Sequence, residues 1–496
     1  MPKVSSPIPI SLRSSGTSSL TTREISLRYI APGVICLIAL FVGWFITGDL
    51  DPFTTTIVLS AIAMFVIGLC NPAAGVYLLI FASGYLDLVK RLGVLTDALS
   101  VDHVILTLTV APLLSVFICF GVVYRCIMKR SWLNPRQLVL AALVVAAMVG
   151  ILLQVYFRGG NALLALKEFA ETGAYLPLTV IVCLLFPNAA DVRRLITFCL
   201  WVYTPVALYG IWQQCFGFSD FEVDYFKSGF TGVGVSAADA RPFSTLNSPE
   251  ALGVVTAVLS AVTALVPLKD GKYAKWQPFA SLLFAAACFA TFARSAWIIL
   301  PLAVLVWVCC RTKLGAIALY GAALVGFGAL LLNADPLLRS LEQIDSLLPQ
   351  DNGVEAQAFH LGTFSDRLMS FRNVLTNPEF HTWFGTGAQD YQDSLEQSYD
   401  NVAHEQIGQT LVSFGFVGLS FFLSVFVFGL IAAHWAIFNQ CDPPRRRMML
   451  GCLSALVAIL FSGMIFGSHL GVFPINVFFA LLAGCFCSLS MSKESL

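Results

Sequence analysis

The sequence predicts an all-α polytopic membrane protein with about fourteen transmembrane helices and two large outer loops, the second of them partly helical. Of its 496 residues, 57% are hydrophobic and only 12% are charged, whereas a soluble domain carries roughly 25% charged residues. Apolar runs long enough to cross a bilayer recur along the chain. The formal net charge is zero, so charge gives no reason to expect a nucleic acid as a partner.

Helices are expected wherever about 20 apolar residues follow one another, with shorter runs allowed where neighbouring helices shield them. Only Asn71 and Pro72 separate the second run from the third, so these two runs either span separately or form a hairpin that does not fully cross. The runs lie near 29–47, 54–70, 72–86, 102–124, 137–156, 169–186, 195–213, 249–267, 277–292, 295–310, 314–333, 408–434, 448–467 and 472–490.

These runs divide the chain into helical and connecting segments. Residues 1–28 are rich in Ser and Thr and no small-residue cleavage site follows the first apolar run, so we expect a disordered cytoplasmic tail and not a cleaved signal. The further segments are transmembrane helices at 29–213, an outer loop at 214–248, central transmembrane helices at 249–333, a large outer loop at 334–407, C-terminal transmembrane helices at 408–490 and a cytoplasmic tail at 491–496.

Lys and Arg in the connecting segments set the orientation of the protein in the membrane. The rule is that short cytoplasmic loops carry an excess of these residues over outer loops. With the N-terminus inside, most of the 29 basic residues lie in cytoplasmic segments and most of the 29 acidic residues lie outside. Both termini are then cytoplasmic. The basic residues that depart from the rule, and so call for another explanation, are Lys90, Arg91, Arg158, Lys167, Lys227, Arg241, Arg294, Arg339, Arg367 and Arg372.

The large outer loop is predicted to hold helices of its own, since a structureless loop of that length is uncommon. Apolar residues at helical spacing between Leu337 and Leu348 predict an amphipathic helix. A second helix is expected over Asp366 to Leu375. There Arg367 and Phe371 would share a face, although Asp366 and Arg372 favour an ordinary solvated face on composition alone.

Three further outer residues are candidates for chemistry. Arg294, in the turn before Trp297, is either an interfacial anchor or part of a ligand site, because an unpaired guanidinium at a membrane boundary is costly. Arg241 opens a polar stretch that either caps the eighth apolar run or binds a polar ligand. His404 stands beside Glu405 before the twelfth run, as a helix-start residue or as a base that accepts a hydroxyl proton.

Together these residues place arginines and one histidine at the outer ends of helices. Arginine pairs bind diphosphates well, because the planar guanidinium is bidentate and permanently charged. We expect no metal, because no carboxylate cluster is present, and no other cofactor. We expect no disulfides, because among the cysteines only Cys215 falls in an outer loop.

In these features the sequence resembles the O-antigen ligases and the O-antigen or exopolysaccharide polymerases, over roughly residues 240 to 430. The order and spacing of the pieces carry the similarity, with a long outer loop between the arginine turn and the histidine. The pieces are the run from Arg241 to Pro249, the turn from Ala293 to Trp297, the pair Arg367 and Phe371, the pair Gly385 and Gly387, and His404 followed by Leu411, Gly415, Gly418 and Leu419.

The resemblance implies that a glycan is transferred from undecaprenyl diphosphate to an acceptor sugar hydroxyl, at the periplasmic face of the bacterial inner membrane and without a metal. By position, Arg294 and Arg367 would hold the diphosphate, and His404 would act near the acceptor. Arg241 and Arg372 are further substrate-binding candidates. The family often has Asn after the histidine and this chain has Glu405, so either His404 or Glu405 is the base.

The expected partners are a lipid-linked glycan donor, a glycan acceptor, the bilayer, and a chain-length regulator or flippase of the same pathway. Polymerisation of repeat units is favoured, because the chain is longer than a typical ligase. The alternatives are a ligase acting on lipid A-core, a solute transporter, and a flippase or scaffold subunit. Transporters tend to place charged sites near the bilayer midplane, whereas here the unusual basic residues gather at one face.

Overall fold

The computed structural model describes residues 52–96, 101–128, 133–159, 169–228, 241–268, 273–332, 374, 382–385, 406–440, 442–467 and 469–491. The regular elements in these ranges are helical. They are α3 (Pro52–Cys70), α4 (Pro72–Leu95), α5 (Val101–Met128), α6 (Pro135–Gly159), the π-turn η2 (Phe169–Gly173), α8 (Pro177–Leu185), α9 (Ala189–Phe216), α10 (Asp220–Lys227), α11 (Pro249–Leu265), α12 (Tyr273–Ala290), α13 (Arg294–Trp297), α14 (Ile299–Cys309), α15 (Lys313–Leu332), α20 (Gln406–Phe438), α21 (Pro443–Phe466), the 3-10 turn η5 (His469–Gly471) and α22 (Ile475–Met491).

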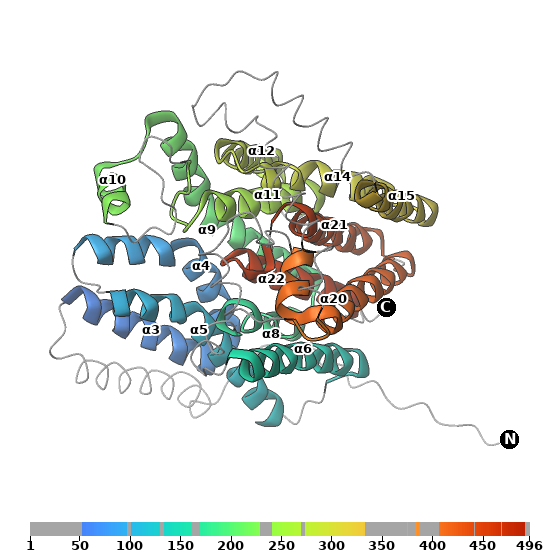
Figure 1. Ribbon diagram of the computed structural model, residues 1–496, viewed down its shortest axis with the longest axis horizontal. Helices are drawn as coiled ribbons and strands as arrows, with labels where there is room; N and C mark the ends of the chain where they lie inside the picture. Colours follow the sequence, from blue (N-terminus) through green and yellow to red (C-terminus); the bar gives the residue numbers. More distant parts are fainter. Residues whose placement is uncertain are drawn as a thin grey trace, which may run out of the picture.

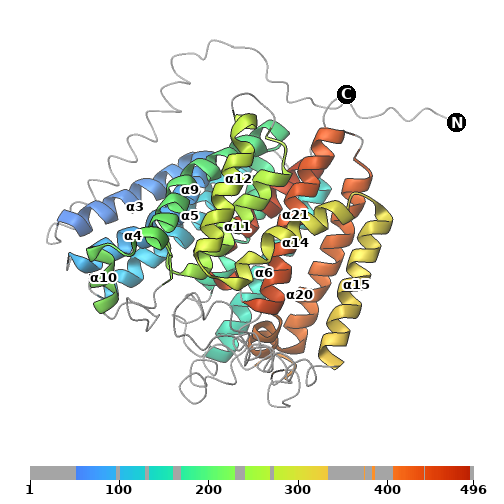
Figure 2. The ribbon, with the colours of Figure 1, turned by 90° about the horizontal axis from the view of Figure 1, so that it is seen from above.

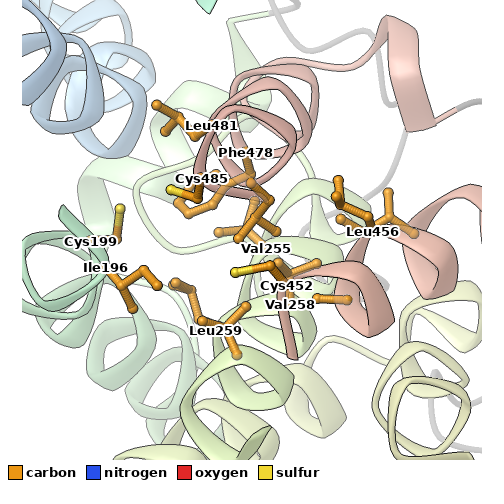
Figure 3. Close-up of a cluster of buried hydrophobic side chains, with 14 of the residues drawn as sticks. Ile196, Cys199, Val255, Val258, Leu259, Cys452, Leu456, Phe478, Leu481 and Cys485 are labelled. Carbon is orange, nitrogen blue, oxygen red and sulfur yellow. The ribbon is translucent and has the colours of Figure 1, made fainter. Parts of the chain in front are cut away.

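The centre of the bundle is built by α9, α11, α21 and α22. Nearly every residue of α11 from Ala251 to Thr263 is buried, as expected for a helix that is apolar on all sides. Figure 3 shows how side chains of the four helices meet, with Val255 and Val258 of α11 beside Cys452 of α21. This core fixes the position of the N-terminal end of α11, where the candidate site begins.

The other helices surround this centre (Figure 1). The group α3, α4 and α5 packs on one side, while α12, α14 and α15 lie across the centre from it. At the periphery, α6 and α20 expose large apolar side chains such as Leu138, Phe428 and Trp435. Exposed apolar side chains on long helices are the surface expected of a protein that faces lipid.

Six helices among the described residues are long and apolar enough to cross a membrane, namely α4, α5, α6, α9, α20 and α21. Shorter apolar helical stretches of 10–17 residues lie at Thr55–Cys70, Pro249–Leu265, Arg294–Cys309, Lys313–Gly326 and Ile475–Met491. Each predicted run from 54–70 onward overlaps at least one helix, so the all-α membrane architecture is confirmed. The count of fourteen spans stays a prediction, and the run 29–47 lies outside the described residues.

Two runs fold differently from the simplest expectation. The run predicted at 72–86 is part of a 24-residue helix, because α4 continues to Leu95 through Asp87, Lys90 and Arg91. The run at 169–186 is not one helix, since η2 and a turn precede Pro177 at the start of α8. Proline lacks an N–H and is therefore favoured at the first turn of a helix.

The two ends of the bundle differ in their charges, and α10 lies at one of them (Figure 2). At the other end, the Nη2 atom of Arg446 donates to the carbonyl of Arg311 over 3.1 Å, and Arg311 lies over the ring of Trp307. Arg125 donates to the carbonyl of Cys70 over 2.6 Å. The predicted cytoplasmic arginines therefore satisfy helix-end carbonyls at one end, and the candidate site residues lie at the opposite end.

Candidate functional site

The turn between α12 and α13 carries Arg294. Phe292 has a positive φ of 51°, a conformation that non-glycine residues rarely adopt. The buried hydroxyl of Thr291 holds the turn, donating to the carbonyl of Cys288 over 2.7 Å and accepting from the amide of Ala293 over 3.2 Å. Arg294 is therefore the first residue of a helix that starts from a tightly held turn, and its side chain is half-buried.

Arg241 reaches the same turn from another segment. Its Nη1 atom donates to the carbonyl of Phe292 over 3.3 Å, and the side chain is exposed. Two of the arginines predicted from the sequence thus lie at one turn, although they are distant in the chain. This end of the bundle therefore carries two arginines at one turn.

The segment between Arg241 and α11 is fixed by Gln213 of α9. The side-chain oxygen of Gln213 accepts from the amides of Phe243 and Ser244, over 3.1 and 2.7 Å. Ser244 has a positive φ of 56°, and its hydroxyl donates to the carbonyl of Val206 over 2.6 Å. At the end of the segment, Ser248 caps α11 by accepting from the amide of Ala251 over 3.1 Å, which is the capping role weighed from the sequence.

A buried ion pair between Arg91 of α4 and Glu222 of α10 lies against the segment that precedes α11. The Nη1 atom of Arg91 lies 3.4 Å from Oε1 of Glu222, and the two side chains are 2% and 0% exposed. The Nη2 atom of Arg91 also donates to the carbonyl of Ser244 over 2.6 Å, and the guanidinium lies 4.7 Å from the ring centre of Phe243. Arg91 was one of the basic residues that departed from the orientation rule, and its role is structural.

Helix α20 is broken at Gly415, whose φ is 65° and ψ is −167°. Residues 382–385 of the preceding loop, the loop strip, lie against this break. The amides of Phe416 and Val417 donate to the carbonyls of Thr382 and Trp383 in this strip, over 3.1 and 3.0 Å. A Cβ on Gly415 would overlap the backbone nitrogen of Gly385. The two glycine motifs that carried the family resemblance are therefore in direct contact.

The start of α20 also meets the turn η5. The side-chain oxygen of Gln406 accepts from the amide of Leu470 over 3.2 Å. In the same turn, Nδ1 of the buried His469 lies 3.2 Å from Oε1 of Glu250, in the first turn of α11. Ser462 of α21 donates to the carbonyl of Ser295 in α13 and lies 3.1 Å from Nε2 of His469, so the segments that begin α11, α13 and α20 are all connected to η5.

His469 was missed in the sequence, where His404 stood out as the histidine beside a carboxylate. The structure gives His469 a carboxylate partner that is remote in sequence. Little in the sequence indicated this pair, because Glu250 is a single acidic residue after Pro249 at the start of an apolar helix. Of the predicted site residues, Arg241 contacts the turn that precedes Arg294, while His404, Glu405, Arg367 and Arg372 lie outside the described residues.

The described residues form a helical bundle whose outer helices suit a lipid environment. Polar side chains gather at one end of it. These features define a polytopic membrane protein with a candidate site at that end. Residues 279–423 match the family model described as O-antigen ligase, from within α12 to the first half of α20. This match confirms the resemblance to the O-antigen ligase and polymerase family, and the matched range contains Arg294, Arg367 and His404. No curated protein matches the chain.

Proposed function

We propose that this protein is a polymerase of O-antigen or exopolysaccharide repeat units. It would transfer a glycan from undecaprenyl diphosphate to an acceptor sugar hydroxyl at the periplasmic face of the inner membrane. The observation that carries the proposal is the O-antigen ligase match over residues 279–423, whose Arg294 turn is contacted by Arg241. The family match is coarser than this proposal, since it does not separate ligases from polymerases.

The arginines would act on the leaving group. As the bond between the anomeric carbon and the diphosphate oxygen breaks, negative charge grows on the undecaprenyl diphosphate. Guanidinium groups placed beforehand at that point stabilise the charge without reorganising. Arg294 and Arg241 lie at one turn, and Arg367 and Arg372 are proposed to approach from the large loop.

The acceptor would need a base, because a sugar hydroxyl is a poor nucleophile at neutral pH. In the proposed step the hydroxyl oxygen bonds to the anomeric carbon, the carrier leaves with the electron pair of the broken bond, and the hydroxyl proton passes to His404 or Glu405. Gln406 supports the placement of His404 and Glu405 near the candidate site. It follows Glu405 directly and accepts a hydrogen bond from Leu470 of η5, which lies beside the start of α11.

The transfer assay uses purified protein, an undecaprenyl-diphosphate-linked repeat unit, and either the same repeat unit or lipid A-core as the acceptor. Polymer from repeat units alone would support the polymerase, whereas product only with lipid A-core would make the protein a ligase. Absence of product with both acceptors, from folded protein, would contradict the proposal and favour a transporter or flippase.

Substitution of Arg294 tests the charge at the carrier site. Arg294→Ala should lower transfer roughly tenfold or more, because a buried charged contact is worth on the order of 2–5 kcal/mol. Arg294→Lys keeps the charge but loses the bidentate fork, so it should also be impaired. The control is Arg194→Ala, whose exposed side chain lies at the opposite end of the bundle. Normal transfer by Arg294→Ala would return Arg294 to the role of an interfacial anchor.

A further inference from the structure

Cationic side chains from two helix connections gather at the end of the bundle opposite the candidate site. Arg311 and Lys313 lie in the turn between α14 and α15 and at the start of α15, and Arg446 lies in the first turn of α21. The Nη2 atom of Arg446 donates to the carbonyl of Arg311 over 3.1 Å, so the two connections are in contact. These three residues form the basic corner.

Aromatic rings hold the cations of the basic corner in place. The Nζ atom of Lys313 and the guanidinium carbon of Arg446 lie 5.9 and 5.7 Å from the ring centre of Phe438, the last residue of α20. The guanidinium carbon of Arg311 lies 3.6 Å from the ring centre of Trp307. A cation is attracted to the negative face of an aromatic ring. The protein therefore orders these side chains before any ligand arrives.

The positive charge of the basic corner is not balanced by a carboxylate among the described residues. Asp442, just before α21, forms no ion pair with the corner in this part of the chain. Arg194 at the same end differs, because its guanidinium lies 3.4 Å from the carboxylate of Asp191. The side chains of Arg311 and Lys313 are also exposed. The basic corner thus presents positive charge that an anion can neutralise.

Apolar surface adjoins the basic corner. Helices α15 and α20 both run from this corner (Figure 2) and are joined by a ring contact further along. Leu314 and Ile317, within about one turn of Lys313, are 78% and 70% exposed. Trp435, one turn before Phe438, is 61% exposed. A free phosphate would use the cations alone, whereas a phospholipid would use the cations and the apolar surface together.

We propose that the basic corner binds the headgroup phosphate of an anionic phospholipid, whose acyl chains lie on the exposed apolar surface of α15 and α20. In the predicted orientation the corner faces the cytoplasmic side, where basic residues between membrane helices suit anionic headgroups. Each cation contributes a charge-assisted contact to the phosphate oxygens. The lipid would tie the turn between α14 and α15 to the start of α21.

The proposal is independent of the proposed function, because it concerns the lipid around the protein and not the glycan. Competition between phosphatidylglycerol and phosphatidylcholine with identical acyl chains tests it. Native mass spectrometry of the purified full-length protein, mixed with equal amounts of both lipids, counts the lipids that stay bound. We expect the wild type to retain phosphatidylglycerol in preference to phosphatidylcholine. Glycerol 3-phosphate at the same concentration should not displace the lipid, because it has no acyl chains.

The variant that combines Arg311→Gln and Lys313→Gln removes two exposed cations and keeps the bond that Arg446 donates to the backbone. A basic residue near the membrane surface contributes about fivefold to the binding of an anionic lipid, so the preference for phosphatidylglycerol should fall on the order of 20-fold. The control is Arg194→Gln, an exposed cation at the same end that already has a carboxylate partner, and its preference should change little.

Thermal unfolding in detergent shows whether the variants are folded. Phosphatidylglycerol should raise the thermal midpoint of the wild type and of the control more than that of the double variant. If the double variant does not fold, Lys313→Gln alone makes the comparison, with an expected loss of about fivefold in the lipid preference.

Three results would overturn the proposal. Equal retention of the two lipids by the wild type would show that the headgroup charge is not recognised. An unchanged preference in the double variant, or an equal loss in the Arg194→Gln control, would place lipid recognition elsewhere. Displacement of the lipid by glycerol 3-phosphate would show that the corner binds free phosphate and not a phospholipid.

Discussion

The guanidinium of Arg241 donates to the backbone carbonyl of Phe292 over 3.3 Å. Phe292 adopts the left-handed conformation that lets the chain turn from α12 into α13, and Arg294 follows two residues later. The contact therefore joins the entry to α11 with the turn that carries the best-placed arginine of the family-matched range.

Substitution of Arg241 should affect transfer more than stability. Arg241→Ala removes one positive charge and the bond to Phe292, so we expect transfer to fall about three- to tenfold, in line with an exposed, charge-assisted hydrogen bond of roughly 1 kcal/mol. The thermal midpoint should stay close to that of the wild type, because the side chain is exposed. Initial rates with the lipid-linked donor measure the effect, and a large loss of stability without any kinetic change would contradict it.

The buried pair of Arg91 and Glu222 should matter mainly for stability. Arg91→Met leaves Glu222 buried without its cation, which should lower the free energy of unfolding by about 3–5 kcal/mol. The double variant Arg91→Met with Glu222→Gln removes both charges and should recover part of that loss. Thermal unfolding in detergent makes the comparison. Lys227→Ala is the control, because its pair with Asp224 is exposed on both sides. A double variant no more stable than Arg91→Met would argue against the pair.

The break in α20 should depend on glycine at position 415. Gly415→Ala places a Cβ against the backbone of Gly385 and 2.5 Å from the oxygen of Thr382, at a φ of 65°. The left-handed conformation alone costs an L-residue roughly 1–2 kcal/mol. We expect reduced yield of folded protein and loss of transfer. Gly429→Ala on the same helix meets nothing within 4 Å and should behave as the wild type. Equal behaviour of the two variants would show that the loop strip does not need this close approach.

The predicted orientation can be tested with two lysines at opposite ends of the bundle. Lys227 lies on the exposed face of α10, and Lys275 lies near the start of α12 and is also exposed. In a Cys215→Ser background, Lys227→Cys should react with a membrane-impermeant maleimide added to intact spheroplasts, and Lys275→Cys should react only after the membrane is opened. The reverse pattern would invert the topology and place the candidate site in the cytoplasm.

Sequence patterns predicted the positions of the helices well, because long apolar runs have few other stable arrangements in a membrane. They also offered a helix cap as one role for the polar stretch before α11, a local signal that needs only adjacent residues, and Ser248 supplies that cap. The pairs of Arg91 with Glu222 and of His469 with Glu250 were not predictable, since each joins helices that only packing brings together. The break at Gly415 was equally hidden, because a glycine in an apolar run is common and its left-handed φ depends on the loop strip beside it.

The most direct test of the account is glycan transfer by His404→Ala, with purified protein, lipid-linked donor, acceptor and EDTA. A positioned base contributes roughly 100- to 10,000-fold, so we expect transfer to fall by about that factor while folding and donor binding persist. Glu405→Gln should have the smaller effect if His404 is the base and the larger effect if Glu405 is. Full transfer by His404→Ala, or wild-type transfer that EDTA abolishes, would contradict the proposed mechanism.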